Sequence, residues 1–151
     1  MRSSISRSTR ATSFLVAAAV VAASLLSGCM MMAKAPSDLD YSRTRTSQSH
    51  RYVATIRPDG DSIPKGKLQR WTLHLETPAG VTVDSATIAI DGGMPQHGHG
   101  LPTKPRVTRA LGHGDHLVEG MKFNMGGWWV VKFRVASTAA GADSVVFNLA
   151  L

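Results

Sequence analysis

The segment from Gly92 to Pro105, GGMPQHGHGLPTKP, places two kinds of metal ligand in a sequence that favours a loop. His97 and His99 stand two positions apart, and Met94 comes just before them. In extended backbone, residues at this spacing lie on the same side, so both imidazoles could hold one ion. Imidazole suits copper and zinc, and a thioether favours Cu(I). Carboxylates are sparse around these positions, which disfavours calcium and magnesium.

A second set of soft ligands follows in the sequence EGMKFNMGGWW. Met121 and Met125 precede the pair Trp128 and Trp129. If this segment lies beside the histidine loop, its thioethers would complete a copper site. The same methionines could equally fill gaps in a core, and His97 could instead hydrogen-bond to its own loop. Spacing alone leaves both the metal site and the structural loop open.

The other histidines are less clearly grouped. His113 and His116 flank Asp115 in GHGDH, where they could form another site, but the short glycine-flanked sequence favours an exposed hairpin turn. His74 is expected on the polar face of a strand and His50 in a tether. Neither has an obvious companion in the sequence.

The sequence carries no familiar catalytic motif. It contains no G-x-S-x-G, no H-E-x-x-H and a single cysteine. Asp84, Asp91 and Asp115 are expected at turns, whereas acid–base chemistry needs paired titratable groups held out of water. We therefore expect a binding protein and not an enzyme.

Residues 1–28 are typical of an export signal. Three arginines precede the apolar run FLVAAAVVAASLL, which is too short for a good membrane-spanning helix. The run ends in Leu-Ser-Gly-Cys, which resembles a bacterial lipobox. Cys29, the only cysteine, is therefore expected to be diacylated with fatty acids such as palmitate, which would anchor the chain at a membrane. Met30, rather than aspartate, follows it, so we expect the periplasmic face of the envelope, with the outer membrane favoured over the inner.

The charge pattern does not support nucleic-acid binding. The formal net charge is +7, and without the signal 14 Lys and Arg stand against 10 Asp and Glu, a charge of +4. These cations are scattered, with no basic block carrying interleaved aromatic residues. We expect a solvated basic surface beside anionic lipid and no nucleic-acid partner.

The sequence after the signal divides into a tether and one domain. Residues 29–50 have no sustained apolar period and would bury too little surface to offset chain entropy, so they predict a lipidated, flexible tether. Residues 51–151 alternate with a period of two in RWTLHLET, WWVVKFRVAS and SVVFNLAL, and more weakly in YVATI, ATIAI, RVTRAL and HLVEGMKF. Turn signals separate these segments. They predict an all-β domain, an immunoglobulin-like antiparallel β-sandwich of about seven strands, with a small barrel as the alternative.

The motifs, taken in order, resemble one family. DGGMPQHGHGLPTKPRVT followed by HLVEGMKFNMGGWWVVKFRV resembles the YtkA-like group, which overlaps FixH-like proteins. The resemblance runs from about Trp71 to Leu151. It implies an exported or membrane-tethered immunoglobulin-like sandwich, similar in plan to periplasmic copper-resistance domains, and some relatives are linked with copper handling or oxidase assembly. The family motif falls on Met94, Pro95, His97, His99, Gly100, Gly120, Met121, Phe123, Met125, Trp128 and Trp129.

Two functions follow as expectations. The first is a lipid-anchored periplasmic copper-binding protein that receives copper from, or delivers it to, an exported redox or copper protein. Its ligands would be His97, His99, Met94, Met121 and Met125. The second is a metal-free module that uses Trp128 to dock an exported partner, such as a cytochrome or another envelope protein.

Overall fold

The structure is a computed structural model that describes residues 35–151, so the expected signal and Cys29 lie outside the described residues. Within residues 35–151 there are nine β-strands, and no helix there is long and apolar enough to cross a membrane. The strands are β1 (Thr44–Thr46), β2 (Val53–Pro58), β3 (Gln69–Glu76), β4 (Thr87–Met94), β5 (His99–Gly100), β6 (Arg106–Gly112), β7 (Asp115–Met121), β8 (Trp128–Ser137) and β9 (Gly141–Ala150).

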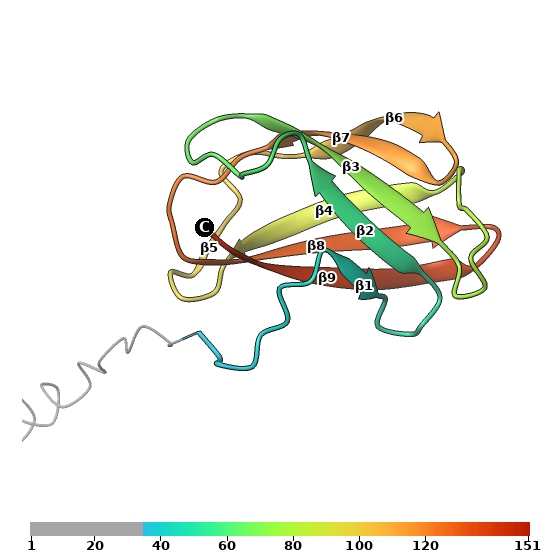
Figure 1. Cartoon of the computed structure of the whole chain (residues 1–151), viewed down its shortest axis with the longest axis horizontal. Helices are drawn as coiled ribbons and strands as arrows, with labels where there is room; N and C mark the ends of the chain where they lie inside the picture. Colours follow the sequence, from blue (N-terminus) through green and yellow to red (C-terminus); the bar gives the residue numbers. More distant parts are fainter. Residues whose placement is uncertain (1–34) are drawn as a thin grey trace, which may run out of the picture. The chain divides into compact units, whose positions relative to one another are not determined.

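The strands form two antiparallel sheets that pack face to face (Figure 1). The first sheet has the order β1-β2-β3-β7-β6, and the second has the order β5-β4-β8-β9. This arrangement confirms the expected all-β antiparallel sandwich. It contains two strands more than the sequence predicts, because β1 and β5 are too short to show an alternating pattern.

The alternation along the long strands decides which side chains enter the core. The buried residues on β3, β8 and β9 are the ones that the period of two predicts, and they include Trp71, Trp129 and Phe147, all 0% exposed. Trp128, next to Trp129, points to the outer face, where its Nε1 donates a hydrogen bond to Asn148 Oδ1 at 3.0 Å. Trp129 is therefore a core residue, whereas Trp128 lies on the outer face of the second sheet.

The folded domain begins before residue 51. In β1, Thr44 lies opposite Thr55 of β2, and further upstream the carbonyl of Asp40 accepts a hydrogen bond from Asn148 Nδ2 at 3.1 Å. Residues 40–50, which the sequence assigns to the tether, are thus held on the sandwich. Their polar composition is compatible with this position because β1 is an edge strand and does not need a continuous apolar face.

Asp143, near the start of β9, holds the segment that follows β1. The Ser47 hydroxyl donates to its carboxylate at 2.6 Å, and the backbone N–H groups of Ser49, Arg51 and Ser144 donate as well. Partial burial raises the pKa of Asp143, but the hydrogen bonds, that of Ser47 foremost, outweigh it and lower the pKa to about 2. All of these donors favour the ionised carboxylate.

A pH series tests this contact. The folded-state pKa of about 2 lies below the value of about 3.9 for an unfolded aspartate. The contribution of Asp143 to the free energy of unfolding is therefore complete above about pH 4 and is lost as the pH falls towards about 2. Asp143→Asn should lower the free energy of unfolding by about 1–2 kcal/mol near neutral pH and flatten its dependence on pH in that acidic range. Urea unfolding followed by tryptophan fluorescence measures both effects.

Asp61→Asn is the matched control, because Asp61 is an exposed aspartate on a loop. It should leave both the free energy of unfolding and its acid dependence close to those of the natural chain. If Asp143→Asn behaved like Asp61→Asn, the contact would contribute nothing to the fold.

Candidate metal centre

A short hairpin at one end of the second sheet carries His97 and His99. Residues 95–98 form the turn between β4 and β5, and the N–H groups of His97 and Gly98 both donate to the Met94 carbonyl at 3.0 Å. Gly98 has a φ of 65°, a conformation that glycine adopts without strain. His97 therefore lies in the turn and His99 in β5, rather than both in one extended segment.

The two imidazoles lie side by side and exposed. Their ring centres are 5.8 Å apart, and the ring planes are inclined by 28°. A ring nitrogen binds a metal at about 2 Å, which places the ring centre roughly 3 Å from the ion. Rings at this separation are close enough to share one ion, provided that each ring turns so that a nitrogen lone pair, which lies in the ring plane, points at it. His99 Nδ1 lies 3.2 Å from the Gly100 carbonyl, which leaves Nε2 of His99 for a ligand.

A row of aromatic rings supports His99 from the core side. The His99 ring meets the Trp129 ring edge-on with centres 5.6 Å apart. Trp129 in turn contacts Phe123 at 5.1 Å, and Phe123 stacks on Trp71 at 5.8 Å. Trp71, Phe123 and Trp129 are fully buried. The exposed imidazole is thus positioned by rings that belong to the core.

Met94 shares a sheet face with His99. The two residues are direct cross-strand partners, and such partners present their side chains on the same face with Cβ atoms about 4.5–5.5 Å apart. Met94 is only 1% exposed. Its methyl group lies over Gly127, where an added Cβ would come within 3.0 Å of Cε. Met94 therefore lies on the buried side of the strand pair, next to the position of His99.

The other two candidate methionines have different environments. Met121, the last residue of β7, is fully buried and lies opposite Gln69 in the first sheet. Met125 is 42% exposed in the loop between β7 and β8, and its carbonyl accepts a hydrogen bond from Trp129 Nε1 at 3.0 Å. Met125 is therefore tied to the indole that supports His99, whereas Met121 is placed in the core.

The hairpin does not bring together enough histidine and carboxylate side chains to coordinate a metal ion fully. Among the residues that the structure describes, no three His, Cys, Asp or Glu side chains are grouped so that they could hold a metal. An ion between His97 and His99 would therefore need a thioether, water or a ligand from another molecule to complete its coordination.

An open hollow of about 340 Å³ adjoins the hairpin. Besides His99, its lining includes Gly93 and Pro95 from the hairpin and Val130 and Lys132 from the outer face of β8. The lining is mostly apolar. The hollow could receive a small ligand, or a side chain of another protein, beside β5.

The remaining histidines lie away from this hairpin. His113 forms the turn between β6 and β7, as the sequence predicts, with a φ of 53°. His116 is buried, with Nε2 at 2.8 Å from the Val83 carbonyl, so the two do not form a pair. His74 does have a companion: its Nδ1 lies 2.7 Å from Asp115 Oδ1, 41 positions along the chain. No sequence signal could reveal that contact, because it depends on the pairing of β3 with β7.

A comparison with family models identifies the relatives of this chain. The model described as YtkA-like matches residues 46–134, from the end of β1 into β8. The chain belongs to the YtkA-like family. The match includes the whole histidine hairpin and the loop of Met125, and it confirms the resemblance seen in the motifs. No curated protein matches the chain, and no solved structure matches it.

Gly93→Ala tests how tightly the hairpin of this YtkA-like domain is held. A Cβ at Gly93 would lie 2.3 Å from the His99 carbonyl oxygen, so β5 would have to move away from β4. We expect a loss of about 1–3 kcal/mol in the free energy of unfolding, as for overpacking elsewhere. The contact between His99 and Trp129 should also change, which tryptophan fluorescence detects.

Gly100→Ala provides the control, because a Cβ at Gly100 meets no atom closer than 3.4 Å. That variant should keep the stability and fluorescence of the natural chain. Equal effects of Gly93→Ala and Gly100→Ala would contradict the close approach of the two strands.

Proposed function

We propose that this protein is a membrane-anchored periplasmic copper-binding protein that takes up or hands on copper and catalyses no reaction. The observation that supports it is the pair of exposed imidazoles, with ring centres 5.8 Å apart, at the tip of the β4–β5 hairpin. His97 and His99 would bind the ion. Membership of the YtkA-like family is compatible with this proposal but does not itself identify a metal.

The ligand types around the hairpin favour copper. Two imidazoles suit copper and zinc alike, and a thioether shifts the preference towards Cu(I). Met94 is the cross-strand partner of His99, and Met125 lies in the loop that hydrogen-bonds to the supporting Trp129. We therefore assign these two methionines as the soft ligands and assign Met121 to core packing.

The openness of the site favours exchange over permanent storage. The imidazoles lie at an exposed tip, and the hollow lined by Val130 and Lys132 opens beside His99. A ligand from an exported redox or copper protein could occupy a free coordination position and draw the ion across. A closed site with four protein ligands would resist such a transfer.

The proposed anchor places the domain close to a membrane. Diacylation of Cys29 would hold the chain at the periplasmic face of the envelope, with the outer membrane favoured because Met30 follows the cysteine. Asp40 is already fixed to Asn148 of β9. Even a fully extended chain from Cys29 to Asp40 spans only about 40 Å. The point where the domain begins would therefore lie within about 40 Å of the lipid anchor, and the proposed copper site would lie no further away than that distance and the length of the domain combined.

Copper titration of the full chain in detergent micelles tests the proposal. The first, tightly bound equivalent of Cu(I) or of Cu(II) should change the fluorescence of Trp129, because His99 contacts that indole. His97→Ala combined with His99→Ala should weaken binding by at least about a hundredfold, a loss of two strong ligands. Met94→Leu, which conserves volume, should weaken Cu(I) more than Cu(II).

His113→Asn is the matched control, since His113 is an exposed histidine in another turn and asparagine tolerates its positive φ. It should bind copper like the natural chain. The proposal fails if the double histidine variant binds copper as tightly as the His113→Asn variant.

A second function, metal-free docking of an exported partner, is favoured by the outer face of β8. Trp128, Val130 and Lys132 alternate with buried residues on this strand, so the indole and the hollow lie on the same face. Trp128→Ala should then weaken binding to a cytochrome or other envelope protein by about 2 kcal/mol or more, measured by pull-down with a metal chelator present. Trp128→Phe should retain most of the binding. Loss of binding on chelation alone would favour copper transfer instead.

A further inference from the structure

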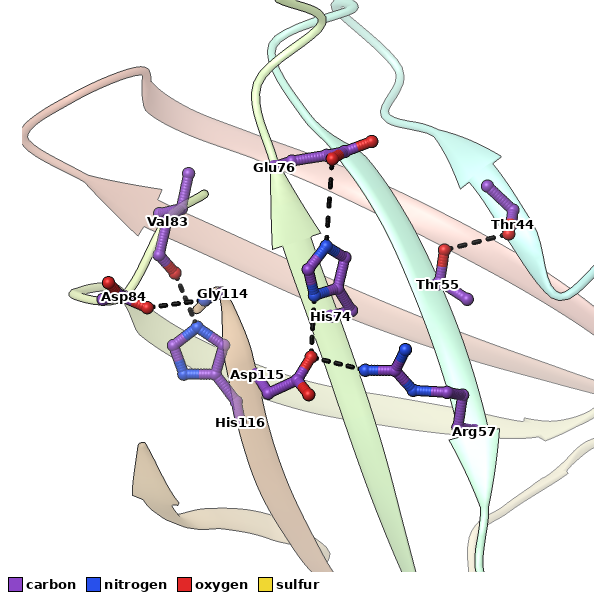
Figure 2. A network of polar contacts seen from close by, with 10 residues as sticks. All are labelled: Thr44, Thr55, Arg57, His74, Glu76, Val83, Asp84, Gly114, Asp115 and His116. Atoms are coloured by element: carbon purple, nitrogen blue, oxygen red, sulfur yellow. Dashed lines mark hydrogen bonds and ion pairs between the residues drawn. The ribbon is translucent and has the colours of Figure 1, made fainter. Parts of the chain in front are cut away.

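A row of polar side chains crosses the outer face of the first sheet. Thr44, Thr55, His74 and Asp115 occupy directly opposed positions on β1, β2, β3 and β7. The two threonine hydroxyls lie 2.9 Å apart. Figure 2 shows the row, with His74 at its centre and a charged side chain on either side of the ring. This face belongs to the sheet that does not carry the histidine hairpin.

Both ring nitrogens of His74 face a carboxylate. Nδ1 lies 2.7 Å from Asp115 Oδ1, and Nε2 lies 3.8 Å from Glu76 Oε2. Arg57 binds the same oxygen of Asp115, as Figure 2 shows. Because a carboxylate only accepts hydrogen bonds, the ring donates its Nδ1 hydrogen to Asp115, and when Nε2 carries no hydrogen its lone pair is available to a metal ion.

We propose that His74 Nε2 and the Glu76 carboxylate form a second metal site, for a divalent ion of the Zn²⁺ or Cu²⁺ class. Water completes the coordination, since the side chains of His74 and Glu76 are still 23% and 35% exposed. Asp115 is a positioning residue that fixes the ring through Nδ1. With two protein ligands the site is open and binds its ion weakly.

The geometry fits two ligands of one ion. His74 and Glu76 alternate on β3, so both point outward from the same strand. Metal bonds of about 2.0–2.2 Å in tetrahedral geometry place two ligand atoms about 3.4 Å apart. The observed separation of 3.8 Å therefore closes with a small rotation of the glutamate, which has no other side-chain partner among the described residues.

The second contact of the ring follows a pattern typical of metal-bound histidine. Metal ligands of this kind commonly donate their other N–H to a carboxylate, which fixes the tautomer and raises the basicity of the binding nitrogen. In this protein Asp115 is the carboxylate that contacts the other ring nitrogen, Nδ1 of His74. Arg57 compensates the charge of Asp115, so Glu76 is left as the uncompensated anion that attracts a cation. Imidazole with carboxylate suits divalent zinc or copper rather than Cu(I).

Zinc is the probe, and the full chain in detergent micelles carrying His97→Ala and His99→Ala is the starting protein. Histidine side-chain nitrogen resonances, followed by NMR during Zn²⁺ titration, should show a saturable shift of His74 Nε2. Glu76→Gln should weaken this binding by at least about tenfold, and Asp115→Asn by about 10–100-fold. Glu119→Gln should have no effect, since it removes a carboxylate from the same face of β7 but away from His74.

The proposal is overturned if zinc leaves the His74 resonance in place, which would make the contact with Glu76 an ion pair only. It is also overturned if Glu76→Gln and Glu119→Gln bind zinc equally well. Because both hairpin histidines are replaced in every sample, neither result depends on whether the hairpin binds copper.

Discussion

The candidate copper site depends on the row of rings that runs from Trp71 through Phe123 and Trp129 to His99. Trp71 belongs to the first sheet and Trp129 to the second, so the row crosses the sandwich before it reaches the surface. Three of the four rings are fully buried, and burial of large apolar rings is the main force that holds two sheets together. The same contacts that stabilise the fold thus fix the orientation of an exposed imidazole on a short, otherwise weakly held hairpin.

Most of the sandwich follows from a simple alternation in the sequence. The segments that contain Trp71, Trp129 and Phe147 each alternate apolar with polar residues, and each forms a long strand with the predicted residues inside. β1 and β5 could not be predicted in this way, because they have three and two residues, too few to show an alternating pattern. Their places are fixed by pairing with β2 and β4, and by the contacts of Asp143, all of which join residues distant in the chain.

The candidate sites differ in how far the sequence reveals them. His97 and His99 are neighbours in sequence, so their proximity could be predicted even though the turn geometry differs from the extended backbone expected. Met94 joins His99 through a hairpin short enough to infer. The contact between His74 and Asp115 could not be predicted, because it requires the register of β3 against β7, and a shift by one residue would turn either side chain to the other face.

The side chains that contact each imidazole determine which class of metal ion would suit it. His99 rests on an indole beside a thioether, an apolar and polarisable setting that favours a soft ion. His74 has a carboxylate on each side, a polar setting that suits a divalent cation better than a soft one. The two candidate sites lie on different sheets and share no residue, so a substitution at one would leave the proposed ligands of the other in place.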